Sequence, residues 1–398
     1  MISAATAVPD ADIVLRDGST IHVRPSTHED ELRLRAFLTS LSEESRWFRF
    51  FSAGINLDRA AHAAAVPAHG LSLLAVRGPE DEVVGHGTYL VGEPGRAEVA
   101  FAVADDWHGH GIATVLLAHL AQAASRADIT TFTASVLRSN HRMLRVFHDS
   151  GFPVSVSSVD DVIELEFPTS LSPDARRRFE DHQRAANVAA VAHVLRPASV
   201  AVIGASRRPH TLGGEVVRNL LASGFSGPLH LVNLRSGEVA GRPTIRSIAD
   251  VEGDVELAVI AVPTAAVLET ASECAEKGVR ALVVLTAGFA EVGSEGRARQ
   301  DELLAVCRAA GMRMVGPNSL GVANLHHQTA LNATFAPAAL SAGSVAFASQ
   351  SAAFGIAAID EAAARGIGLS SCVSMGNKAD VSGNDFLEYW EQDPETAV

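Results

Sequence analysis

Two glycines stand between a strand-like and a helix-like segment, in the stretch Trp107-His108-Gly109-His110-Gly111-Ile112-Ala113. The apolar alternation of residues 97–103 predicts a strand before it, and the helical spacing of apolar residues over 111–127 predicts a helix after it. Glycine allows tight turns and close approach of main-chain N–H groups to a ligand. A helix N-terminus adds unpaired N–H groups and partial positive charge. The stretch is therefore predicted to bind a pyrophosphate, although it matches neither the ATP-binding nor the dinucleotide-binding glycine loops.

This stretch resembles the Q/R-x-x-G-x-G/A loop of the GNAT acyltransferases, which holds the pyrophosphate of acyl-CoA. Gly111 and Ala113 match the last two fixed positions, and His108 stands where Gln or Arg is usual. The resemblance implies acetyl-CoA as cofactor and backbone N–H groups from Phe101 to Val103 facing the thioester carbonyl. It assigns these loop residues to the cofactor site: His108, Gly109, His110, Gly111, Ile112, Ala113 and Thr114.

Glu98 is the candidate catalytic base. A lysine ammonium has a pKa near ~10.4, so only about one in a few thousand is neutral at pH 7. A carboxylate whose pKa is raised by an apolar setting can remove the excess proton. Glu98 lies on the predicted strand between Ala97 and Val99. A charged residue in that pattern faces either solvent or a cleft, and we predict that Glu98 faces a cleft.

The segment Asn140–Phe152 resembles the GNAT pattern N-x-x-A-x-x-x-Y-x-x-x-G-F. Asn140, Gly151 and Phe152 fit, but Phe147 stands at the tyrosine position. The resemblance implies that Asn140 contacts the cofactor. Phenylalanine cannot donate a proton, so we expect the leaving thiolate to receive one from water or from the amine through the base.

The opening of the chain narrows the family. Asp17-Gly18-Ser19, Val23-Arg24-Pro25 and residues 41–51 resemble the "DGS…vRP…LSxeSxyxRFf" opening of GNAT domains joined to acyl-CoA synthetase domains, the Pat-type protein lysine acetyltransferases. That resemblance implies a lysine acceptor on another protein, an AMP-forming acyl-CoA synthetase. Core packing is the other interpretation of the aromatic residues in 41–51, and both can hold.

Three regions and a joint follow one another along the chain. The first mixes a strand pair around a turn at 17–18, two helices and further strands flanked by helices, which predicts an α+β domain, the one that resembles GNAT. The second alternates buried strands with helices, which predicts a doubly wound, Rossmann-like α/β sheet. The third is a partial flavodoxin-like α/β domain, so we expect a truncated or naturally shortened chain. The predicted boundaries are 13–167, 168–193 for the joint, 194–321 and 322–398. A simple linker is favoured for the joint over a connecting helix.

The second region resembles the CoA-binding domain of NDP-forming acyl-CoA synthetases and of succinyl-CoA ligase α subunits. The resemblance rests on segments that follow predicted strands and implies a second CoA site. Its candidate residues are Gly204, Ala205, Ser206, Asn233, Pro263, Gly288 and Asn318. In the same family, the phosphohistidine and the ATP-grasp domain would lie beyond Val398. We therefore expect this part to bind CoA or to regulate, and not to synthesise acyl-CoA.

Composition excludes several classes of function. The net charge of −14 argues against nucleic acid as a partner, because phosphate backbones require basic surfaces. The chain has no run of 18 apolar residues and no signal-like start, so we expect neither a membrane partner nor export. Cys274, Cys307 and Cys372 are too far apart for a metal site and read as buried residues of a cytoplasmic protein.

We therefore predict an acetyl-CoA-dependent lysine Nε-acetyltransferase acting on a protein. Two other functions remain open. One is an N-acetyltransferase for a small amine, against which the synthetase-like fusion argues. The other is a sensor of CoA or acyl-CoA that has lost catalysis, for which Phe147 argues.

Overall fold

The computed structural model describes residues 11–15, 19–52, 54–78, 81–170, 173–235 and 237–397. The chain divides into two compact units, with most residues up to Ala185 in the first and most from Ala186 onward in the second. Helix α6, Pro173–Leu195, runs across this division, so the joint contains the connecting helix that the sequence left as an alternative. The predicted turn at Asp17-Gly18 lies outside the described residues.

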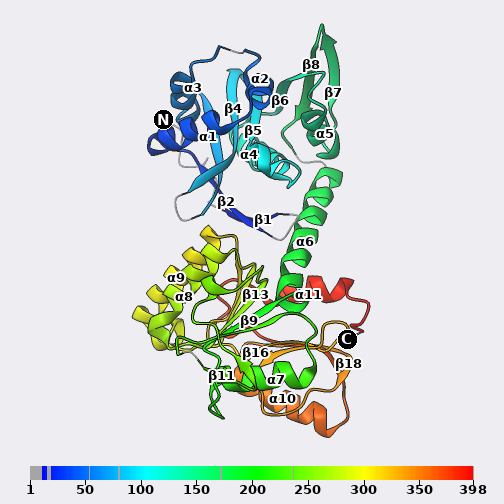
Figure 1. The fold of residues 1–398 in the computed structure, drawn as a ribbon. Helices are drawn as coiled ribbons and strands as arrows, with labels where there is room; N and C mark the ends of the chain where they lie inside the picture. Colours follow the sequence, from blue (N-terminus) through cyan, green and yellow to red (C-terminus); the bar gives the residue numbers. More distant parts are fainter. Residues whose placement is uncertain are drawn as a thin grey trace. The chain divides into compact units, whose positions relative to one another are not determined.

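The first unit is built on an eight-stranded sheet in the order β1-β2-β3-β4-β5-β6-β8-β7. All neighbouring pairs whose register is described are antiparallel except β5 and β6. The strands are β1 Ala11–Val14, β2 Thr20–Pro25, β3 Gly70–Arg77, β4 Glu82–Glu93, β5 Arg96–Val103, β6 Thr131–Leu137, β7 Ser155–Val159 and β8 Val162–Pro168. The β7–β8 hairpin, drawn in dark green in Figure 1, forms one edge of the sheet; β7 was not predicted.

Helices cover both faces of this sheet. They are α1 Glu31–Ser40, α2 Glu43–Phe50, α3 Leu57–Ala65, α4 Ile112–Arg126 and α5 His141–Asp149, with short 3-10 turns η2 His28–Asp30 and η3 Asp105–Trp107. One core packs α1 and α3 on the face of β5 that carries Ala102. The other packs α4 and α5 on the opposite face, which carries Val99 and Phe101. Successive β5 side chains therefore enter two different layers, as strand geometry requires.

Strands β5 and β6 pair over a short distance. Their register is Arg96 with Thr131, Ala97 with Phe132 and Glu98 with Thr133, and it extends no further. On its other side, β5 pairs with β4 as far as Val103. Beyond Glu98 the edge of β5 that faces β6 is consequently open, inside the sheet.

An ion pair at the start of α1 explains one of the sequence motifs. Arg24 donates from both terminal nitrogens to the carboxylate of Asp30, at 2.8 and 2.7 Å, and Asp30 is 1 % exposed. The Asp30 carboxylate also accepts from the Thr27 N–H at 2.9 Å. The hydrogen bonds from Arg24, opposed by burial, lower the pKa of Asp30 to about 2. Arg24 of the Val23-Arg24-Pro25 motif thus fastens β2 to the first helix.

The second unit contains a five-stranded parallel sheet in the order β10-β9-β13-β14-β15. Its strands are β9 Val200–Ile203, β10 Leu229–Val232, β13 Leu257–Ile260, β14 Ala281–Val284 and β15 Arg313–Val315. Its helices are α7 Leu212–Ser223, α8 Thr264–Lys277 and α9 Ser294–Ala309, with turns η4 Ile248–Asp250 and η5 Ala290–Val292 and a small ribbon of β11 Glu238–Val239 and β12 Arg242–Pro243. Helices α8 and α9 lie side by side on one face (Figure 1). This is the predicted Rossmann-like arrangement.

A four-stranded sheet in the order β17-β16-β19-β18 completes the unit. Its elements are β16 Gly321–Asn324, β17 Leu331–Thr334, β18 Ala342–Ser349, β19 Leu369–Ser374, α10 Ala352–Ala364 and α11 Gly383–Gln392. Strands β18 and β19 are parallel, whereas β16 is antiparallel to its two neighbours. Within the described residues, no helix is both long and apolar enough to span a bilayer.

Replacing Asp30 by Asn should lower the stability of the first unit by about 2 kcal/mol, because it removes the charged hydrogen bonds of the buried carboxylate and leaves Arg24 only the more exposed Asp81 carboxylate, at 3.2 Å. For a unit of this size, that corresponds to a fall in Tm of roughly 4–8 °C in calorimetry. The wild-type advantage is fully present above the ordinary pKa of 3.8 and disappears as the pH falls toward 2, because the folded-state pKa is the lower one.

Asp58→Asn is the matched control, since Asp58 pairs with Arg35 at the surface and both side chains are more than half exposed. That change should alter stability by less than about 1 kcal/mol. Equal losses for the two variants would contradict the role given to Asp30.

Candidate active site

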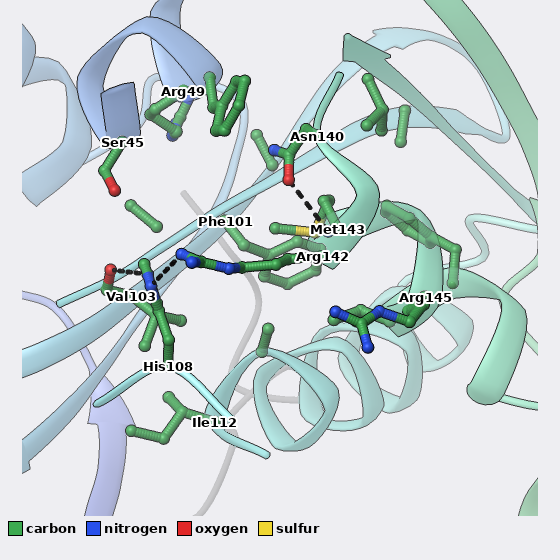
Figure 2. Close-up of a pocket in the computed structure, with 18 of the residues that line it drawn as sticks. Ser45, Arg49, Phe101, Val103, His108, Ile112, Asn140, Arg142, Met143 and Arg145 are labelled. Carbon is green, nitrogen blue, oxygen red and sulfur yellow. Dashed lines mark hydrogen bonds between the residues drawn. The ribbon is translucent and has the colours of Figure 1, made fainter. Parts of the chain in front are cut away.

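A cavity of about 700 Å³ lies in the first unit, where β5 separates from β6. Its wall is formed by α2, β5, the loop after β5, the start of α4, β6 and α5 (Figure 2). Of the residues predicted for this site, all but His110 line the cavity: Glu98, Phe101, Val103, His108, Gly109, Gly111, Ile112, Ala113, Thr114 and Asn140. The ring of His110 instead packs against Trp107, with centroids 5.3 Å apart.

Backbone donors of β5 point into this cavity. The N–H of Ala104 donates to the Val84 carbonyl on the β4 side, at 2.9 Å. Because N–H directions alternate along a strand, those of Val103 and Phe101 point to the other side, toward the open edge. Both residues line the cavity. The open edge therefore offers two main-chain donors to a ligand.

The loop before α4 has the conformation that its glycines allow. Gly109 and Gly111 have φ of 87° and 92°, in the left-handed region that L side chains rarely adopt. Gly111 is the N-cap of α4, and no side chain caps the helix. The N–H groups of the first helical residues, Ile112, Ala113 and Thr114, have no partner within the helix. This helix start lines the cavity and is a site for an anion.

His108 links this loop to α5 and to β5. Its Nε2 lies 3.1 Å from the Val103 carbonyl oxygen, and its Nδ1 lies 2.8 Å from Nη1 of Arg142. The carbonyl can only accept and the guanidinium can only donate, so His108 carries its proton on Nε2 and is neutral in this arrangement. Figure 2 shows Arg142 extending from α5 across the cavity to reach it. Arg142 was not singled out in the sequence, although it lies in the Asn140–Phe152 motif.

Glu98 lines the cavity and its side chain is exposed, so it faces both the cleft and the solvent, the two possibilities that the sequence pattern allowed. A second charged group, Arg49 at the end of α2, lines the same cavity. Burial lowers the pKa of Arg49 to about 10, and the charge of Glu98 opposes that shift. Arg49 was not predicted as a site residue. Residues 41–51 were interpreted as a family motif and an aromatic cluster, and no helix that would turn one face toward the cavity was predicted there.

His86 on β4 is a buried neighbour of Arg49. Burial, together with the charge of Arg49, lowers the pKa of His86 to about 3, so its ring is neutral at physiological pH. Its Nε2 lies 3.0 Å from the Ser72 hydroxyl. His86 is therefore a satisfied part of the sheet and does not supply a second cation.

Helix α5 supplies Asn140 and Phe147. Asn140 is its N-cap, and Oδ1 accepts from the Met143 N–H at 3.0 Å. Phe147, at the tyrosine position of the family pattern, is 2 % exposed and packs against Phe101 and Phe167. The structure thus places an apolar ring where the family pattern has a hydroxyl.

One carboxylate connects α2 to the start of the loop. Asp105 accepts from the Ser42 N–H and hydroxyl, both at 2.8 Å, and from the Ser45 hydroxyl at 2.7 Å. Burial would raise the pKa of Asp105, but these hydrogen bonds outweigh it and hold the pKa below its ordinary value. The clamp fixes the helix that carries Arg49 to the loop that begins the anion site.

The candidate CoA residues of the second unit gather at the carboxyl ends of its parallel strands. Each group follows one strand: Gly204, Ala205 and Ser206 follow β9, Asn233 follows β10, Pro263 follows β13, Gly288 follows β14 and Asn318 follows β15. Ligands of open α/β sheets bind at this edge. The Asn233 amide donates to the Ala205 carbonyl at 2.6 Å, which ties two of these ends together.

Glycine is required at the end of β9. Gly204 has φ of 93°, and a Cβ there would lie 2.6 Å from the Ala261 carbonyl oxygen. On the β14 side, Glu291 accepts from the Gly288 N–H at 2.5 Å and from the Asn377 amide at 2.5 Å. The turn after β14 is thus held to the segment after β19.

Three family matches divide the chain in the same order as the structure. Residues 36–152 match the acetyltransferase (GNAT) family, 198–324 match a CoA binding domain, and 342–398 match the succinyl-CoA ligase like flavodoxin domain. The chain joins a GNAT domain to acyl-CoA synthetase-like domains. These matches confirm the predicted fold class, and they imply CoA or acetyl-CoA as the ligand.

Curated relatives match parts of the chain. The α subunit of ADP-forming acetate–CoA ligase I from Pyrococcus furiosus is 39% identical over 51% of this chain and 44% of that protein. The ADP-forming 4-hydroxybutyrate–CoA ligase of Nitrosopumilus maritimus is 36% identical over 52% of this chain and 29% of that protein. An acetyltransferase of Pseudomonas aeruginosa is 32% identical over 28% of this chain and 63% of that protein. The chain spans less than half the length of these ligases.

Solved structures also match parts of the chain. The dinucleotide-forming acetyl-coenzyme A synthetase 1 of Ca. Korarchaeum cryptofilum is 39% identical, with a TM-score of 0.50, over 52% of this chain and 44% of that chain. The GNAT domain of S. lividans PAT is 34% identical, with a TM-score of 0.38, over 42% of this chain and 99% of that chain.

Replacing Arg142 by Gln should raise the KM for acetyl-CoA about 10-fold, because the exposed guanidinium, which donates to His108 from Nη1, has further N–H donors for a phosphate oxygen. S-acetyl-pantetheine has no pyrophosphate, so its KM should change little. Steady-state kinetics with the two thioesters measures the difference.

Arg126→Gln is the matched control, since Arg126 is exposed at the far end of α4. It should leave both KM values unchanged. A rise of equal size for the two thioesters in Arg142→Gln would show that Arg142 does not contact the pyrophosphate.

Proposed function

We propose that this protein transfers the acetyl group of acetyl-CoA to the Nε of a lysine on another protein. The observation that carries the proposal is that one cavity, at the open edge of β5, is lined both by the helix start at Ile112–Thr114 and by Glu98. The anion site can bind the pyrophosphate of acetyl-CoA, and the carboxylate can take the proton of the attacking amine. The transfer requires both groups in one cavity.

The transfer uses groups of this chain. The amine nitrogen attacks the thioester carbon, so a C–N bond forms and the C–S bond breaks. Glu98 takes the proton that the amine loses, and the N–H groups of Phe101 and Val103 stabilise the negative charge on the carbonyl oxygen. The released proton reaches the thiolate through water, because Phe147 has no hydroxyl to donate.

The acetyl-CoA residues are those of the loop and of α5. The N–H groups of Ile112, Ala113 and Thr114 bind the pyrophosphate, with Gly109 and Gly111 allowing its close approach. Because the Oδ1 of Asn140 caps α5, its amide N–H groups are the donors that it offers to the cofactor. His108 contributes by positioning Arg142.

The acceptor side is formed by α2. Trp47 and Phe51 of this segment are 44 % and 37 % exposed, and Phe51 also lines the cavity. Exposed aromatic rings beside a cavity suit a protein partner better than a small amine. The resemblance of residues 41–51 to Pat-type enzymes supports an AMP-forming acyl-CoA synthetase as that partner.

The second unit binds CoA or acyl-CoA at the carboxyl ends of β9, β10, β13, β14 and β15. This proposal rests on the family match and on the clustering of Gly204–Ser206, Asn233, Pro263, Gly288 and Asn318 at that edge. Binding of CoA or acyl-CoA to the second unit would then make the acetyltransferase of the first unit responsive to the CoA concentration.

Replacing Glu98 by Gln should reduce acetyl transfer about 100-fold or more, because the amide cannot take the proton of the amine. The assay follows radiolabel from acetyl-CoA into a purified AMP-forming acetyl-CoA synthetase, and mass spectrometry identifies the modified lysine. No transfer by the wild type would refute the proposed function, and equal transfer by both proteins would remove Glu98 as the base.

Glu166→Gln is the matched control, because Glu166 lies on β8 outside the cavity wall and pairs with Arg96 at the surface. It should transfer at the wild-type rate. Acetylation of small amines without any protein lysine would favour the small-amine alternative.

Titration of the intact chain with CoA should give two sites per molecule by calorimetry. Arg142→Gln should weaken one of them and leave the other unchanged, because the two sites lie in different units. A stoichiometry of one in the wild type would contradict the second site.

A further inference from the structure

The guanidinium of Arg49 has a charge and donors that the transfer as described does not use. Arg49 is half-buried, lines the cavity and comes from α2 (Figure 2). Its Nε is fully buried and has no hydrogen-bond partner among the described residues. The ring of Phe50 lies 5.1 Å from the guanidinium carbon and supplies no oxygen acceptor. Burial of an unpaired charged donor is unfavourable, so its retention needs a reason.

Arg49 lies on the side of the sheet opposite α4. It interacts electrostatically with Glu98 on β5 and with His86 on β4. His86 pairs in register with Ala102, whose side chain belongs to the core packed by α1 and α3. The phosphate loop begins α4, which covers the other face. The Arg49 guanidinium is therefore beside the base, on the acceptor side of the cavity.

Hydrogen bonds at the N-terminal end of α2 fix the position of Arg49. Ser42, the N-cap, and the Ser45 hydroxyl hold α2 to Asp105, about two turns and one turn before Arg49 respectively. A cation held in this way, with no acceptor for its Nε in the part of the chain that the structure describes, is prepared for an oxygen that arrives with a ligand. Its planar donors suit a carboxylate or a carbonyl oxygen.

We propose that Arg49 hydrogen-bonds an oxygen of the acyl acceptor, a main-chain carbonyl or a carboxylate at the base of the lysine side chain, while Glu98 receives the amine itself. The inference rests on the proposed lysine transfer and adds a determinant of acceptor specificity to it. The cavity then recognises an amine at Glu98 and an oxygen acceptor at Arg49. An acceptor with an amine alone satisfies one of them, and a lysine within a peptide satisfies both.

Three acceptors test the proposal: Nα-acetyl-lysine, Nα-acetyl-lysine N-methylamide and n-pentylamine. The first offers a carboxylate and the carbonyl of its acetyl group, the second offers carbonyl oxygens alone, and the third offers the same primary amine without an oxygen. The measured quantity is kcat/KM with saturating acetyl-CoA, corrected for hydrolysis of the thioester. In the wild type, the acceptors with oxygen should be preferred over n-pentylamine.

Arg49→Met should reduce that preference about 10-fold or more, as loss of a charged hydrogen bond predicts. Arg49→Lys should restore part of it. If the carbonyl is the partner, kcat/KM relative to n-pentylamine should fall equally for both lysine derivatives. If the carboxylate is the partner, it should fall only for Nα-acetyl-lysine. Arg145→Met removes another arginine of the cavity wall, on α5, and should leave the preference unchanged.

An unchanged preference in Arg49→Met overturns the inference and leaves the lysine transfer standing. An equal loss for all three acceptors also overturns it, because that result describes a structural role. Wild-type activity with n-pentylamine but with neither lysine derivative refutes the proposed function and the inference together. Hydrolysis of acetyl-CoA at the wild-type rate in each variant shows that the cofactor side is intact.

Discussion

The early separation of β5 from β6 is the constraint on which the rest of the first unit depends. Parallel pairing ends at Glu98, while β5 continues to Val103. A sheet interrupted in this way leaves main-chain donors inside the molecule without strand partners, which a folded protein tolerates only where something else can satisfy them. The cavity occupies this gap, and every group assigned to the chemistry lies on its border.

Charge is distributed around that gap in a consistent order. The uncapped start of α4 and Arg142 lie where phosphates would be bound, and the neutral ring of His108 holds Arg142 in place. Glu98 and Arg49 lie toward α2. The replacement of the family's tyrosine by Phe147 removes a hydroxyl without opening a hole, because its ring packs against Phe101 and Phe167. The cavity therefore keeps its shape, and Phe147 offers no hydroxyl to a ligand there.

Much of this arrangement could be predicted from periodicity and motif spacing. The strand at 131–137 and the helix after Gly111 lie where the apolar pattern indicates. Helix α2 was not predicted because none of its residues is fully buried. Its apolar residues border a cavity instead of filling a core, so they do not give the usual pattern of a buried helix face. Strand β16 was missed because it is short and depends on pairing with β17 and β19. The roles of Arg49 and Arg142 could not be read from the chain, since both depend on contacts between separate elements.

The three hydrogen bonds that Asp105 accepts from Ser42 and Ser45 also have a thermodynamic consequence. Asp105 belongs to the turn that leads into the phosphate loop, whereas the two serines begin the helix of the acceptor wall. A ligand that orders one wall thereby restricts the motion of the other, so the conformational entropy lost on binding is shared between two substrates. Such sharing would be reciprocal: under the proposed transfer, whichever of acetyl-CoA and the acceptor binds first would raise the affinity for the other by the same factor.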